Sequence, residues 1–280
     1  MAVRDILVQL RDDAPSRARL ALAAEIAARQ GAHLTGLFVV DVPLPVFAGA
    51  DGSGGAAVAD LLGRLREDAL AEGARIQPGF TEALRRHGVV GEWRQTEGPT
   101  MALLPRHARY ADLVILGQPA PEDATAGFAA IEATLFASGR PLLLVPHIGA
   151  AAPPGRRVMI GWNASREAAR AVHDALPLMA GAAAVTVVVI NPADAPGTHG
   201  EEPGADIARH LARHGLPVTV RALAGEEIAA GELLLNAAAD LGADLIVMGG
   251  YGHSRLREWA LGGATRTLLR AMTAPVLMSH

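Results

Sequence analysis

The chain alternates short, continuously apolar runs with longer stretches in which apolar residues recur at helical spacing. Such runs are typical of strands buried on both faces of a parallel sheet, and the helices between them cover that sheet. In the second half the pattern predicts strands near 157–161, 185–190, 217–223, 243–248 and 275–279, and helices near 165–180, 204–214, 226–240 and 263–272. We therefore predict an α/β fold.

The first half shows the same order of elements. An apolar run at Arg4–Leu10 precedes an alanine-rich helix at about Pro15–Gln30, and His33–Val40 and a long helical region at about Val58–His87 follow. The glycine-rich segment Asp51–Gly55 follows no strand and opens no helix. We therefore interpret it as a flexible loop rather than a ligand cradle.

Two later blocks of the first half return almost literally in the second. Ala111–Gly117 parallels Ala243–Gly249, and Pro141–Leu144 parallels Pro275–Met278. Matched blocks in the same order indicate an internal duplication.

The segment Pro146–Gly155, rich in proline and alanine, is interpreted as the linker between the copies. The predicted domains are residues 1–149 and 155–280. A length of 280 residues suits two such units better than one core.

Composition excludes several kinds of chemistry. The chain has no cysteine, which rules out disulfides, zinc–thiolate sites and iron–sulfur clusters. It has no lysine, since all 25 basic residues are arginine, which rules out a P-loop lysine or a Schiff base. The net charge of −4 and the scattered arginines argue against nucleic acid as a partner. The charged start and the lack of a long apolar run predict a cytoplasmic protein with no membrane partner.

One segment carries candidate chemistry. Gly249-x2-Gly252-x9-Gly262 leaves the fourth strand of the second half, and Gly262-Gly263 opens a helix. Glycines let the backbone approach a phosphate closely, and a helix N-terminus adds unpaired N–H groups. An open α/β sheet also binds ligands beyond the carboxyl ends of its strands. On spacing alone, tight strand-to-helix turns would explain these glycines equally well.

This segment, between Ala243–Met248 and Ala274–Met278, resembles the universal stress protein family, and the resemblance covers nearly the whole chain as a tandem pair. It implies two open, doubly wound, parallel five-stranded sheets of strand order 3-2-1-4-5, Rossmann-like and of the adenine nucleotide alpha hydrolase-like type. It also implies ATP as the ligand, with Mg²⁺ as its companion ion.

The resemblance assigns site residues by position. Those on the phosphate side would be Met248, Gly249, Gly252, Gly262, Gly263 and Ala264, and those near the nucleoside would be Asn163 and Val189. Gly263 stands where the family usually has Ser or Thr, and Asn163 where it usually has Asp. A lost hydroxyl donor to phosphate would weaken binding about ten- to a hundredfold.

The first half departs further from the family pattern. Gly117 is followed by Gln118-Pro119-Ala120 without a second glycine, and Ala137-Ser138-Gly139, taken as the counterpart of the later glycines, opens no helix. Arg11 stands in place of the aspartate. We predict that this half is degenerate and binds no nucleotide.

Other candidate groups are weaker. His210 and His214 share a helix face but have no glutamate between them, so a solvated face is favoured over a metal site. His253 and Ser254 could reach a phosphate or simply lie on the surface. The tryptophans are expected to pack in the fold rather than stack on a ligand. No nucleophile–base pair or catalytic residue is identified.

Three functions remain open at this point. The first is a stress-response regulatory protein that binds ATP or a related adenine nucleotide in the second domain and acts on an unknown protein partner. The second is a nucleotide-free interaction module, and the third is a slow ATPase. The resemblance also implies that the last strands pair in an intramolecular pseudo-dimer, with contacts from Leu142, Leu144, Val276 and Met278. A homodimer of full chains is left open.

Overall fold

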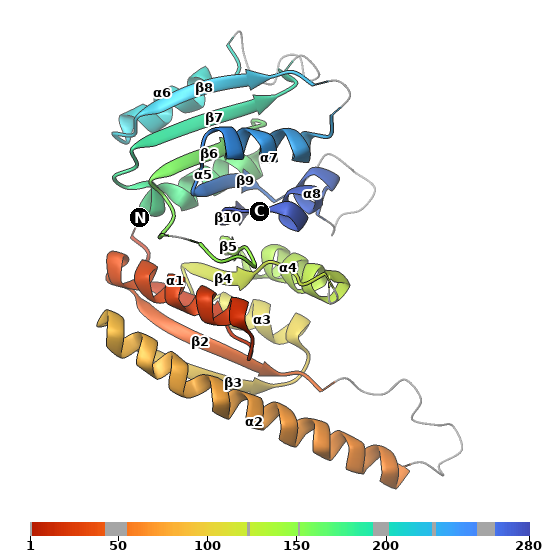
Figure 1. Ribbon diagram of the computed structural model, residues 1–280. Coiled ribbons are helices and arrows are strands. Elements are labelled where there is room, and N and C mark those ends of the chain that lie inside the picture. The colour runs from red at the N-terminus through yellow and green to blue at the C-terminus, as the bar shows by residue number, and fades with distance from the viewer. Residues whose placement is uncertain are drawn as a thin grey trace.

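The computed structural model describes residues 2–42, 55–121, 124–150, 152–192, 202–225, 228–250 and 261–280. Within them the chain forms one ten-stranded sheet with helices on both faces (Figure 1). The strands are β1 (Asp5–Gln9), β2 (His33–Val40), β3 (Gly91–Glu97), β4 (Leu113–Gly117), β5 (Leu142–Val145), β6 (Arg157–Gly161), β7 (Ala184–Ile190), β8 (Val218–Leu223), β9 (Leu245–Gly249) and β10 (Val276–Ser279). The helices are α1 (Ala14–Gln30), α2 (Gly55–His87), α3 (Thr100–Ala108), α4 (Ala124–Ser138), α5 (Arg166–Met179), α6 (Ala205–Arg213), α7 (Ala230–Asp240) and α8 (Gly263–Ala271).

The two halves repeat one topology. The strand order β3-β2-β1-β4-β5-β10-β9-β6-β7-β8 contains the predicted order 3-2-1-4-5 twice, and neighbouring strands within each half are parallel. The α/β prediction with two doubly wound halves is therefore confirmed. The two sheets are not separate, however, but continue into one another.

The continuation runs through the last strand of each half. β5 and β10 pair antiparallel, with Val276 opposite Leu144 and Met278 opposite Leu142. The side chains of these two strands are almost completely buried. This contact is the predicted pairing of the last strands. It removes one sheet edge from each half.

Two apolar layers fill the space between the sheet and its helices. One layer gathers buried side chains from α1, α2, α5 and α6, and the other from α3, α4, α7 and α8. Each layer extends across the junction, with Leu143 and Leu277 in the first and Leu144 and Met278 in the second. The halves therefore share a core as well as a sheet.

The repeated Ala-Asp pair has a structural role in both halves. The Asp244 carboxylate, just before β9, accepts hydrogen bonds from the backbone N–H groups of Gly155, Arg156 and Arg157 at 2.8–3.2 Å. Asp112, just before β4, accepts from the N–H groups of Arg4 and Asp5 in the same way. Each aspartate therefore anchors the start of the neighbouring central strand, which leaves it no part in the ligand crevice.

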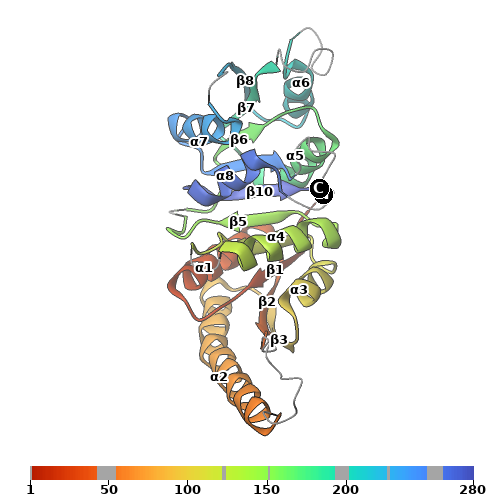
Figure 2. The same ribbon diagram turned by 90° about the vertical axis from the view of Figure 1, so that its right-hand side faces the viewer.

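The two edge strands, β3 and β8, contain more polar and exposed residues than the central strands. β3 alternates exposed and half-buried residues because it is an edge strand. On the covered face of β3, the Trp93 ring stacks on Phe38 with 6.3 Å between ring centroids and contacts Phe80 in a tilted arrangement at 5.8 Å. Trp93 is therefore a packing residue, as predicted. Trp162 packs against the first core layer, and Trp259 lies outside the described residues. In both views α2 extends well beyond the sheet (Figures 1 and 2).

Candidate functional site

The candidate crevice lies where the chain order of the second half reverses. β6 and β9 are hydrogen-bonded neighbours, yet the chain runs from β6 outward to β7 and β8, whereas β9 leads to β10 on the other side. Such a switch point opens a gap at the carboxyl ends of the two strands, because the segments that follow them diverge. Among the described residues, those that flank this position are the turn after β6 and the start of α8.

A tight turn follows β6. Ala164 adopts a left-handed conformation with φ of 56°, and Ser165 caps α5 by accepting a hydrogen bond from Ala168 N at 3.1 Å. The Asn163 side-chain oxygen accepts from Ser165 N at 3.2 Å. The oxygen that replaces the family's carboxylate is thus used inside the turn, while the residue itself is exposed at the crevice.

Met248 and Gly249 end β9. Met248 is buried in the second core layer, and Gly249 lies against the start of α5. A Cβ on Gly249 would stand 2.7 Å from Ala168 N and 2.9 Å from the Glu167 carbonyl carbon. Both are backbone atoms at the start of α5, so they cannot move aside easily. Packing alone therefore requires glycine at 249, whatever ligand the crevice holds.

The start of α8 is the other flanking segment. Gly262 is the N-cap residue, and no side chain of the described residues caps it; the Arg266 N–H is the one that bonds back to its carbonyl. The first N–H groups of the helix, from Gly263 and Ala264 onward, have no partner within the helix itself. Within the described part of the chain, an added Cβ on Gly263 would meet no atom within 4 Å. An uncapped helix start with free space beside it is a favourable anion site.

Two assigned residues do not join this group. The Val189 side chain is fully buried in the first core layer, on the side of α5 and α6, so a contact with a ligand there would have to come from its backbone. Gly252 lies outside the described residues, as do His253 and Ser254. Of the other assigned residues, Asn163 lies in the turn after β6, Met248 and Gly249 end β9, and Gly262, Gly263 and Ala264 form the start of α8.

In the first half an arginine fills the equivalent place. The Arg19 side chain of α1 is buried; its Nε donates to Gln9 O at 2.9 Å and its Nη2 to Ser16 Oγ at 3.1 Å. Its Nη1 lies only 2.2 Å from where a Cβ on Gly117 would be. Burial lowers the pKa of this guanidinium to about 10. The guanidinium thus occupies the space between the carboxyl ends of β1 and β4.

The proposed counterpart of the later glycines in the first half is wrong. Ala137-Ser138-Gly139 lies at the carboxyl end of α4, and Gly139 follows the helix with φ of 70°. Counting back from the matched Pro141 and Pro275 instead places Phe128 opposite Gly262. This stretch of the first half has no two adjacent glycines to mark the start of the helix, as Gly262 and Gly263 do in the second half.

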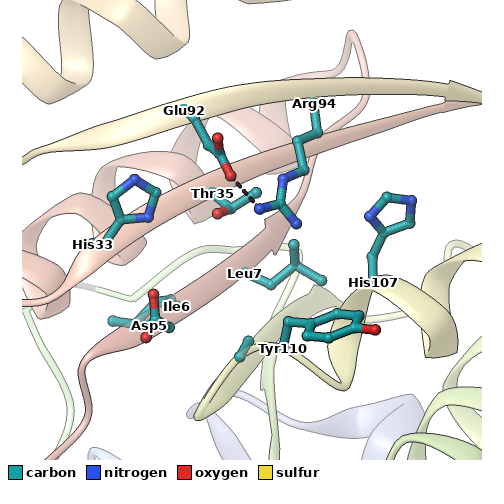
Figure 3. A pocket seen from close by; sticks show the side chains of 10 residues that line it. Asp5, Ile6, Leu7, His33, Thr35, Glu92, Arg94, His107 and Tyr110 are labelled. Carbon is teal, nitrogen blue, oxygen red and sulfur yellow. Dashed lines mark hydrogen bonds and ion pairs between the residues drawn. The ribbon is translucent and has the colours of Figure 1, made fainter.

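A cavity of about 300 Å³ lies at the other edge of the first half (Figure 3). Its polar groups come from the amino ends of β1, β2 and β3 and from the end of α3, as Asp5, His33, Thr35, Glu92, Arg94, His107 and Tyr110. Figure 3 shows the Glu92–Arg94 ion pair along one side, with His33 near one end and His107 near the other. This cavity lies far from the switch point at which sheets of this kind bind ligands.

His107 makes the stability of the fold depend on pH. Burial, helped by Arg94 and Arg106, lowers the pKa of its imidazole. The unfolded chain therefore binds this proton more readily, and stability falls as the pH drops below about 6.5. His107→Gln is expected to reduce the loss of unfolding free energy between about pH 7.5 and about pH 5.5, measured by urea unfolding. The exposed His210→Gln serves as the control; an equal change in both variants would contradict the assignment.

The described residues contain neither a cluster suited to a metal ion nor a helix suited to a membrane. No group of three or more His, Asp or Glu side chains in that part of the chain is arranged to hold a metal ion. No helix within the described ranges has the length and apolar character needed to cross a membrane. His210 and His214 lie edge to face at 4.8 Å on an exposed face of α6.

Fold and crevice together define a tandem, doubly wound α/β protein with a glycine-rich segment at one switch point. Residues 155–280 match the universal stress protein family. The whole chain is similar in fold to a universal stress protein from Archaeoglobus fulgidus DSM 4304, at 15% identity and a TM-score of 0.73, over 99% of this chain and 96% of that one. A functionally unknown protein from Pseudomonas aeruginosa PAO1 is similar at 18% identity and a TM-score of 0.56, over 99% and 92%.

No curated protein matches the chain. The second half of the chain belongs to the universal stress protein family, and the chain as a whole has the tandem form of that fold.

Proposed function

We propose that this chain is a stress-response regulatory protein that binds ATP or a related adenine nucleotide in its second domain, residues 155–280. The observation that carries the proposal is the start of α8, which no side chain of the described residues caps and which is the next helix after β9, a strand of the switch point. Anionic phosphates would accept hydrogen bonds from its free N–H groups, beside the open position of Gly263. The nucleoside would lie toward Asn163, and Mg²⁺ would accompany the phosphates.

The first domain, residues 1–149, is proposed to bind no nucleotide. The Arg19 guanidinium and its hydrogen bonds occupy the space that a ligand would need beside Gly117. Removing a buried guanidinium from this position would cost its bonds and its packing. This half therefore acts as a partner domain rather than as a second site.

The protein is further proposed to act without turnover, in the cytoplasm, through a regulatory protein partner. Hydrolysis would need a positioned base and a metal ligand. Among the described residues beside the switch point, the only candidates are Asn163, an amide that is no base, and Glu167, whose side chain is buried. Measurement of phosphate release from ATP distinguishes this proposal from a slow ATPase.

Equilibrium dialysis with labelled ATP, with and without Mg²⁺, tests the binding itself. Saturable binding to the full chain supports the proposal. Absence of binding at millimolar ATP would contradict it and favour the nucleotide-free interaction module.

Gly263→Ser gives a sharper prediction. The new side chain enters open space at the first residue of α8, where its hydroxyl can donate to a phosphate. We expect ATP affinity to rise about tenfold, because a hydrogen bond to a charged group contributes about 1.5–3 kcal/mol. Gly263→Ala, which adds the Cβ alone, is the matched control. Equal affinities for the two variants would show that no phosphate lies near residue 263.

A further inference from the structure

Helix α4 of the first half contacts both described flanks of the glycine-rich segment of the second half. The Glu132 Oε1 atom accepts a hydrogen bond from Leu261 N at 3.1 Å and another from Arg266 Nη2 at 2.7 Å. One turn further along α4, Leu135 packs against Gly250, so closely that a Cβ there would lie 2.4 Å from Leu135 Cδ2. One helix of the first half therefore supports Gly250 and Leu261 at once.

The same half also holds α8 along its length. The guanidinium groups of Arg266 and Arg270 lie over the Phe128 ring, at 5.9 and 5.7 Å from its centroid. At the far end of α8, Gln118 Nε2 donates to the carbonyl oxygens of Leu269 and Arg270 at 3.0 and 2.9 Å. The orientation of α8 therefore depends on the first half from its first turn to its last.

The Leu261 contact has the most direct bearing on the crevice. Leu261 immediately precedes the N-cap residue Gly262, and two successive glycines have unusual backbone freedom. A hydrogen bond to a carboxylate, 15% exposed, restrains the chain just before these glycines. Arg266 balances the charge of Glu132, so the carboxylate can lie close to an anion site with little repulsion.

We propose that the first half positions the nucleotide site of the second half, with Glu132 as the positioning residue that fixes Leu261 and thereby the N–H groups at the start of α8. This inference rests on the proposed function. It gives the degenerate half a role: nucleotide binding in one half and docking of the other are coupled, and by linkage each strengthens the other.

Four variants of the full chain separate the contacts of Glu132. Glu132→Ala removes both, and we expect ATP affinity to fall about tenfold or more. Glu132→Gln keeps an acceptor for Leu261 N and should stay within about threefold of the parent. The charge-exchanged double variant Glu132→Arg/Arg266→Glu keeps an ion pair but cannot accept from Leu261 N, so its affinity should fall as in Glu132→Ala. Gln118→Ala loosens the far end of α8 and should stay within about threefold.

Two results would overturn the inference. One is parental ATP affinity in Glu132→Ala. The other is an equal loss in Gln118→Ala and Glu132→Ala, since that would indicate only a weaker junction between the halves.

Amide hydrogen exchange of the unliganded chain provides a readout that does not depend on nucleotide. The Leu261 amide should exchange faster in Glu132→Ala than in the parent, whereas the Gly250 amide, bonded to Ser279 O at 2.9 Å, should not change. Unchanged exchange at Leu261 contradicts the positioning role. Failure of the parent to bind ATP refutes the proposed function and the coupling, while the exchange result still decides whether Glu132 fixes Leu261.

Discussion

The second half expressed alone, as residues 155–280, is expected to self-associate into heterogeneous oligomers. Without β5 the hydrogen-bonding edge of β10 is unpaired, and the side chains of Val276, Leu277 and Met278 lose the neighbours that bury them completely. Each such side chain contributes up to about 1.5–3 kcal/mol when buried. An open apolar edge strand pairs readily with another copy.

Light scattering over a range of concentrations measures this association. The full chain at the same concentrations is the control, because its two edges meet within one molecule at a high effective concentration. A monodisperse, concentration-independent monomer of the isolated half would show that the β5–β10 contact does not protect the edge.

Gly249→Ala is expected to lower the free energy of unfolding of the second half by about 2–3 kcal/mol or more. The new methyl group meets the backbone of Glu167 and Ala168, and neither the capped start of α5 nor the central strand β9 can move without losing hydrogen bonds. Urea or thermal unfolding of the full chain measures the change.

Gly263→Ala is the matched substitution at an open position. It places a good helix former at the first residue of α8, so its unfolding free energy should stay within about 0.5 kcal/mol of the parent or rise slightly. Equal destabilisation by the two variants would mean that the close contact between β9 and α5 is not what requires glycine at 249.

The sequence predicted the central strands and the helices between them within a few residues. Residues 158–160 and 187–189 are buried on both faces, so these runs contain no polar residue. The edge strand of the first half was harder to predict, since Gly91–Glu97 is half-exposed and carries no apolar run. Only the repeat, which requires a third strand in each half, indicates that a strand belongs there.

The residues that end β9 and begin α8 were predicted in the second half because glycine spacing carries that information. The contents of the first-half crevice were not. Arg19 lies in an alanine-rich helix with other arginines nearby, and an arginine in such a helix is ordinarily solvated. Its apolar neighbours Leu20, Leu22 and Ala23 are the one available signal.

The pairing of the last strands was predicted from the family resemblance, but the side-chain contacts between α4 and α8 were beyond sequence reasoning. Glu132 is the one charged residue of α4, so no pattern of charges along the helix points to a partner. Its partners, Leu261 and Arg266, are more than 100 positions away. Antiparallel pairing of β5 with β10 had to be established before α4 and α8 could be placed side by side.

Glu132 and Arg266 stand nine residues before the matched Pro141 and Pro275, so they occupy the same position in the two copies. In a symmetric pair of identical subunits such a position faces itself, and two glutamates or two arginines would repel each other. Opposite charges became available there only once the copies were encoded separately. The salt bridge therefore contributes to specificity, because it favours association of a first half with a second half over association of two like halves. Gene duplication has in this way turned a self-recognising surface into a pair of complementary ones.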